Sequence, residues 1–81
     1  MKIDFPQFRK YNNELSYFKI IDDITFIEYK RLGSKIERFE FKAKILPDRN
    51  FLFDMLYNYK TNWIKIDEVE FKHFLTKFEI V

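Results

Sequence analysis

The sequence predicts an α+β domain in which a three-stranded antiparallel β-meander has one face covered by two helices. Two observations lead to this fold class. Residues 16–45 contain three β-branched and aromatic segments separated by turn signals, as expected for consecutive strands. Residues 48–78 contain two segments whose apolar residues recur at helical spacing. A chain of 81 residues suffices for one core, so we expect residues 1–81 to form a single small domain.

The first fifteen residues follow neither a helical nor a strand period. Phe5, Phe8 and Tyr11 are spaced three residues apart, and the asparagine pair at 12–13 predicts a turn. We therefore expect residues 1–15 to be an irregular arm whose aromatic side chains pack on the body of the domain.

Residues 16–21 and 24–31 are rich in β-branched and aromatic residues, which favours strands in both segments. Residues 24–32 also fit a helix that would end at Gly33, so strand and helix both stay open there. The strand is preferred because such a helix would carry apolar groups on every side. Gly33 is the only glycine and lies where a hairpin turn needs a positive φ.

Residues 35–45 show the clearest strand pattern, a strict alternation that places one face in the core and the other in water. We expect Pro47 to end this strand. The apolar set is Phe39, Phe41, Ala43 and Ile45, and the polar set is Arg38, Glu40, Lys42 and Lys44.

Two amphipathic helices are predicted at 48–59 and 67–78, with a short fourth strand as a further candidate at 63–66. Asp48 is the expected N-cap of the first helix, and Asp67 followed by Glu70 is a variant of the capping box for the second. The stripe of the first helix is Phe51, Leu52, Met55, Leu56 and Tyr59, and that of the second is Phe71, Phe74, Leu75 and Phe78.

No combination of side chains in the sequence points to catalysis, so we expect the protein not to be an enzyme and to need no cofactor or metal. The absence of cysteine excludes disulfides, zinc–thiolate sites and thiol chemistry. His73 is the only histidine, and we expect it on the surface without an orienting partner. The acidic pairs at 22–23 and 67–68 are interpreted as turn and N-cap residues rather than cation ligands.

One pair of aromatic residues indicates an interaction surface. Phe53 and Tyr57 are four residues apart on the first predicted helix and lie outside its apolar stripe. Exposed aromatic residues are typical anchors of protein interfaces. The alternative, left open, is that the arm with Phe5 and Phe8 folds back over them. The preferred hypothesis is a small intracellular interaction module or accessory subunit that binds a protein partner or a second copy of itself.

A basic surface supports an alternative hypothesis, nucleic-acid binding by the hairpin at 30–44. Arg38, Lys42 and Lys44 share one face of the predicted strand, and Arg49 lies near a helix start that could hold an anion. The aromatic residues of this strand point to the other face, which weakens the hypothesis, because nucleic-acid-binding sheets interleave aromatic and basic side chains.

Composition gives only broad limits on location. The net charge of +2 demands no anionic partner, and the chain has neither a signal-peptide segment nor a membrane span. We expect a protein of the bacterial cytoplasm that does not bind membranes. A small enzyme or ligand carrier is the hypothesis with least support, because it would need a pocket that no pattern here indicates.

Overall fold

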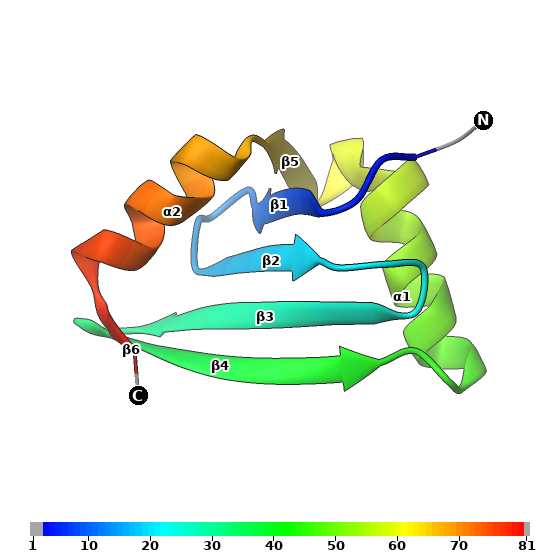
Figure 1. Cartoon of the computed structure of the whole chain (residues 1–81), viewed down its shortest axis with the longest axis horizontal. Coiled ribbons are helices and arrows are strands. Elements are labelled where there is room, and N and C mark those ends of the chain that lie inside the picture. Colours follow the sequence, from blue (N-terminus) through cyan, green and yellow to red (C-terminus); the bar gives the residue numbers. More distant parts are fainter. Residues whose placement is uncertain (1–2, 81) are drawn as a thin grey trace.

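A single sheet forms the centre of the computed structural model, which describes residues 3–80. Within that range the strand order is β5-β1-β2-β3-β4-β6, and neighbouring strands are antiparallel except β4 and β6 (Figure 1). The strands are β1 (Gln7–Tyr11), β2 (Ser16–Ile20), β3 (Thr25–Leu32), β4 (Lys35–Lys42), β5 (Trp63–Ile66) and β6 (Glu79–Ile80). The helices are α1 (Leu46–Tyr57) and α2 (Glu68–Lys77), with a short 3₁₀ turn, η1 (Tyr59–Thr61).

The predicted meander is confirmed in β2, β3 and β4, which pair in that order. Residues 24–32, for which strand and helix were both considered, form strand β3. Gly33 has a φ of +64° in the turn that follows it, a conformation that residues with a Cβ rarely adopt. Strand β4 ends at Lys42 instead of residue 45, because a hydrogen bond from Lys44 N–H to the Lys42 carbonyl turns the chain away.

The predicted number of strands is too low, since residues 7–11 of the expected irregular arm form strand β1. This strand pairs with β2 on one side and with β5, the short strand expected at 63–66, on the other. Its alternation is hidden in the sequence because the buried positions include Arg9, a charged residue where an apolar one is expected. Residues 1–2 of the predicted arm lie outside the described range.

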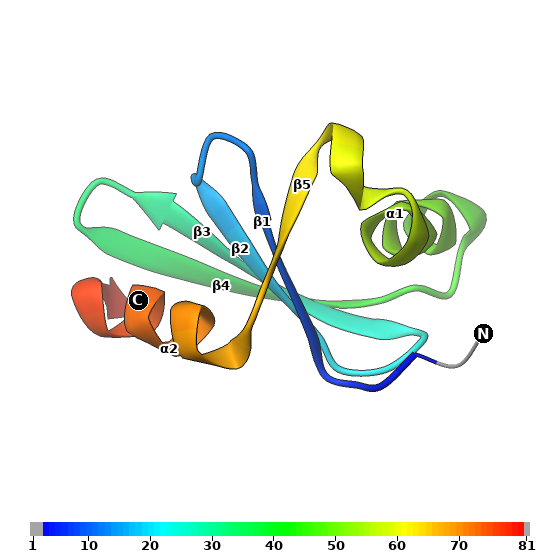
Figure 2. The ribbon, with the colours of Figure 1, turned by 90° about the horizontal axis from the view of Figure 1, so that it is seen from above.

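The two helices lie on opposite faces of the sheet, which corrects the prediction that both cover one face (Figure 2). Strand β2 shows the reason, because it carries large aromatic residues on both sides. Tyr17 packs in the cluster with α2, whereas the next residue, Phe18, packs in the cluster with α1. Alternate residues of a strand point to opposite faces, so a strand that is aromatic at successive positions needs a cover on each side.

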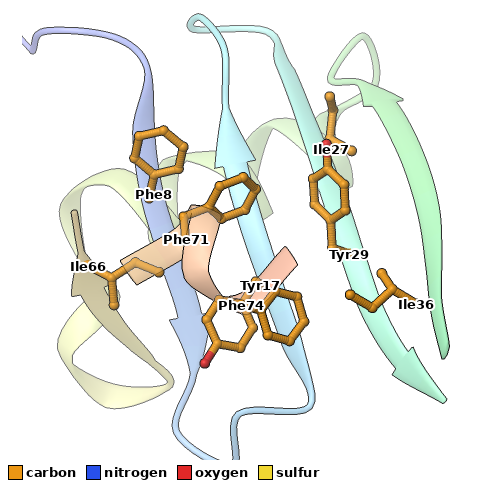
Figure 3. Packing of buried hydrophobic residues seen from close by; sticks show 8 residues of the cluster. All are labelled: Phe8, Tyr17, Ile27, Tyr29, Ile36, Ile66, Phe71 and Phe74. Carbon is orange, nitrogen blue, oxygen red and sulfur yellow. The ribbon is translucent and has the colours of Figure 1, made fainter. Parts of the chain in front are cut away.

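Aromatic packing dominates the core on the α2 side (Figure 3). The rings of Tyr17 and Phe74 stack with centroids 3.6 Å apart, and those of Phe8 and Phe71 are 4.8 Å apart. The core on the α1 side consists of Phe18, Ile20, Phe26, Ala43, Leu52, Met55, Leu56 and Trp63.

Helix α1 begins before the predicted start. Its N-cap is Ile45 and no side chain caps it, so the expectation that Asp48 is the N-cap is wrong. Pro47 lies within the first turn, where a helix needs no backbone N–H and the fixed φ of proline is favourable. The start of α2 is as predicted, because the side chain of Asp67 accepts a hydrogen bond of 2.8 Å from the N–H of Glu70.

Loss of this cap will cost stability. We expect Asp67→Ala to lower the free energy of unfolding by about 1 kcal/mol, because one N–H of the first turn of α2 loses its acceptor. Asp67→Asn keeps an acceptor oxygen and serves as the matched control. Urea denaturation monitored by circular dichroism measures both values, and equal losses in the two variants would show that the hydrogen bond is not the cause.

Candidate functional site

Helix α1 carries apolar residues on two opposite sides. Leu52, Met55 and Leu56 are buried against the sheet, as predicted. Leu46, Phe53 and Tyr57 are 67%, 53% and 51% exposed. At 100° per residue these three side chains fall within about 40° of one another on the helix surface. We call them the outer stripe.

The aromatic part of the outer stripe is preorganised. The rings of Phe53 and Tyr57 are in contact, with centroids 4.7 Å apart and planes inclined by 42°. The alternative that the N-terminal segment covers them is wrong, because Phe8 packs against Phe71 on the opposite face and Phe5 is itself 38% exposed. Because the two exposed rings already contact each other, each side chain has less conformational entropy to lose when a partner binds.

A shallow hollow of about 260 Å³ adjoins the outer stripe. Its apolar wall comes from α1, and its rim carries one cation and one anion, Arg49 and Asp23. Its volume exceeds that of one large apolar side chain. The lining residues are Asp23, Arg49, Leu52, Phe53, Leu56 and Tyr57.

The four basic residues singled out in the sequence do not form one surface. Arg38 and Lys42 share a face of β4, but Glu40 lies between them and its carboxylate is 3.4 Å from the Arg38 guanidinium. Lys44 lies in the loop after the strand, and Arg49 lies on α1 beside the hollow. Of the cations across the hairpin, Lys30 is opposite Glu37, and Arg31 covers the ring of Phe78 at 4.8 Å.

The only histidine borders a second, small cleft between α2 and the turn after β1. His73 is exposed there and shares the cleft with Lys10, whose ammonium is 2.8 Å from carboxylate oxygens of both Glu14 and Glu70. Burial alone would lower the pKa of Lys10, but hydrogen bonds to the two carboxylates outweigh it and raise the pKa above its usual value. The amine is therefore held in its protonated form, which is not nucleophilic.

The acidic pairs have the local roles predicted for them. An Asp22 oxygen accepts a hydrogen bond from the N–H of Ile24, and this bond holds the pKa of Asp22 below its ordinary value. Asp67 caps α2, as described above. Over residues 3–80, no group of three His, Asp or Glu side chains is placed to hold a metal ion.

Arg9 is a buried cation in a segment expected to be irregular, and no pattern in the sequence indicates its burial. Arg9 is 2% exposed, and its Nε donates a hydrogen bond of 2.8 Å to the carbonyl of Met55 in the last turn of α1. Its Nη1 donates to Gln7 Oε1 and to the Phe8 carbonyl, and the guanidinium lies 4.5 Å from the centre of the Tyr59 ring. Burial lowers the pKa of Arg9. These contacts place Arg9 as the link between β1 and the C-terminal end of α1, where a cation is favourable.

Comparison with family models, with curated proteins and with solved structures finds no match to this chain. Neither helix of the described part has the length and apolar content that a membrane crossing requires. The fold and the outer stripe thus define an α+β domain with an exposed, partly aromatic helix face.

Proposed function

We propose that this chain is a protein-interaction module that binds an amphipathic helix of another protein through the outer stripe of α1. The observation that carries the proposal is the second apolar side of α1, where Leu46, Phe53 and Tyr57 are each at least half exposed. The core does not need these residues, since α1 already buries its opposite side. Large exposed apolar groups gathered on one helix face are typical of interaction sites.

The dimensions of the outer stripe favour a helical partner. From Leu46 to Tyr57 it extends about 16 Å along the helix axis, which corresponds to three turns. A partner helix with apolar residues at i, i+3 or i+4 and i+7 would contact it over that length. One apolar side chain of the partner would enter the hollow, and polar groups beside it would meet Arg49 and Asp23 at the rim.

Nucleic-acid binding has less support from the geometry. The basic residues on which that hypothesis depends lie on different surfaces, and Glu40 separates the two that share a strand face. Substitution of Phe53 and Tyr57 separates the two hypotheses, because binding through phosphates would not depend on the aromatic residues of α1.

A double substitution in the outer stripe will strongly weaken partner binding and leave the fold intact. We expect Phe53→Ala/Tyr57→Ala to change the free energy of unfolding by about 0.5 kcal/mol or less per site, as is usual for exposed positions. We expect it to weaken binding of a purified partner by about 30-fold or more, the loss typical of interface anchors. The partner is identified by affinity capture with nuclease treatment, and its affinity is then measured by calorimetry.

The matched control is Leu15→Ala/Val69→Ala, which removes exposed apolar groups (50% and 76% exposed) outside α1. This variant should bind the partner as the wild type does. Three outcomes would contradict the proposal: equal binding by both double variants, unfolding of the Phe53→Ala/Tyr57→Ala variant, or recovery of nucleic acid whose binding requires Arg38 and Lys42.

A further inference from the structure

Strand β4 presents a long open edge. It is the last long strand of the sheet, and β6 pairs only with its first residues, Lys35 and Ile36 (Figure 1). Within residues 3–80 no strand pairs with the outer edge of Glu37–Lys42. Such an edge exposes backbone donors and acceptors that another strand can use.

The direction of these backbone groups follows from the pairing with β3. The N–H of Ala43, directly after β4, donates to the carbonyl of Ile24 at 2.6 Å. Because hydrogen bonding alternates along an antiparallel ladder, odd-numbered residues of β4 bond to β3. The N–H and C=O groups of Arg38 and Glu40 therefore point to the open edge, and Phe39 lies between them with its side chain 39% exposed.

We propose that a second copy of this chain pairs with this edge, β4 antiparallel to β4, with the twofold axis at Phe39. In this register Arg38 of each copy lies directly opposite Glu40 of the other, so the dimer contains two identical pairs of opposite charge. The two Phe39 side chains lie opposite each other at the centre, in a non-hydrogen-bonded pair where side chains are closest. Opposite charges and aromatic pairs at directly opposed positions stabilise antiparallel strands, and the arrangement is a closed, self-complementary dimer.

Neighbouring registers of the same symmetry are unfavourable. A twofold axis at Arg38 would place two arginines in opposition. An axis at Glu40 would place two glutamates in opposition and also set Arg38 against Lys42. An axis at Phe41 would leave only residues 40–42 within the strand, since β4 ends at Lys42. The charged side chains of β4 disfavour pairing with unrelated strands, and they favour a single register for pairing with a second copy of the chain.

Pairing about Phe39 extends over Glu37–Phe41 and displaces β6 from the edge. In this register Lys42 of one copy comes opposite Ile36 of the other, the position with which Ile80 of β6 pairs in the single chain. Because the twofold axis is perpendicular to the sheet, the face that carries α1 in one copy continues into the same face of the other copy. Both copies of α1 would then lie on the same face of one continuous sheet, and two outer stripes would be available to a bivalent partner. The dimer itself does not depend on the proposed function of the outer stripe.

Cysteine cross-linking tests the register. The chain has no cysteine, so Phe39→Cys introduces a single thiol. In the proposed dimer the two Cα atoms at position 39 are about 4.5 Å apart, within the range that a disulfide spans. The control Glu37→Cys places its two thiols about 14 Å apart, beyond that range. We expect Phe39→Cys to form a covalent dimer under mild oxidation and Glu37→Cys to stay monomeric; equal cross-linking of the two would overturn the register.

Charge exchange tests the pairing. We expect sedimentation equilibrium to show a reversible wild-type dimer, weakened at least tenfold by either Arg38→Glu or Glu40→Arg. Mixing the two variants should restore a dimer, because every 38–40 pair then joins a glutamate and an arginine, and so should the double exchange Arg38→Glu/Glu40→Arg in one chain. Circular dichroism confirms that each variant is folded.

Two results would overturn the proposed dimer. One is a wild-type protein that stays monomeric at millimolar concentration. The other is loss of the dimer in Phe53→Ala/Tyr57→Ala, which would assign self-association to α1. Retention of the dimer in that variant supports edge pairing whether or not a partner helix binds the outer stripe, so the two proposals fail separately.

Discussion

Phe18→Ala will lower the free energy of unfolding by about 3–5 kcal/mol, the usual cost of removing a buried phenylalanine. Phe18 is fully buried at the centre of the core on the α1 side. Its ring contacts Tyr11 of β1 edge-to-face at 5.1 Å, and it packs near Phe26 of β3 and Phe51 of α1 at 6.5 and 6.1 Å. The truncation would leave a cavity between β1, β2, β3 and α1, and the strands cannot move inward to fill it.

Denaturation in urea measures this loss, with Trp63 as an internal fluorescent probe because it is the only tryptophan and is 5% exposed. Phe18→Leu, which keeps much of the side-chain volume, should lose clearly less. A loss below about 1 kcal/mol in Phe18→Ala would mean that the core on this side is not close-packed.

The second large effect is expected at Arg9. Arg9→Ala removes the side-chain donor to the Met55 carbonyl and leaves space beside the Tyr59 ring. We expect the free energy of unfolding to fall by about 3 kcal/mol, since an unsatisfied buried acceptor costs about 1–3 kcal/mol and the cavity adds to that cost. For a domain of this size that corresponds to a decrease in Tm of roughly 12–24 °C.

Arg9→Met separates the two contributions, because it keeps the apolar stem of the side chain and removes the guanidinium. If hydrogen bonding to the end of α1 is the main contribution, Arg9→Met will lose nearly as much stability as Arg9→Ala. Thermal unfolding monitored by circular dichroism provides the comparison. A stable Arg9→Met variant would show that Arg9 acts by filling space, and would contradict its role as the link between β1 and α1.

The same two residues show where reasoning from the sequence works and where it does not. Phe18 belongs to a β-branched and aromatic segment, and such a segment predicts strand β2 without tertiary information. Arg9 belongs to a segment in which a charged side chain occupies a core position. No local pattern predicts that burial, because it depends on a carbonyl that lies far along the chain in α1.

The outer stripe of α1 can be predicted from the sequence only in part. The spacing of Phe53 and Tyr57 placed them outside the buried stripe of α1, and the structure shows that both are exposed. Leu46 was missed because the helix was expected to begin at Asp48, whereas it begins at Leu46 with Pro47 in its first turn. The edge of β4 was missed as well, because strand order and the position of β6 depend on pairings between distant segments.

The local features of this protein can be predicted from its sequence: the strands of the meander, the turn at Gly33, the short strand at 63–66 and the cap of α2 at Asp67. Each follows from interactions between residues close in the chain, which a short window of sequence contains. Contacts between distant segments, in contrast, determine that β1 joins the sheet, that the helices pack on opposite faces and that Arg9 is buried. Alternation shows which residues share a face of a strand, but burial of each face depends on which distant segment packs against it.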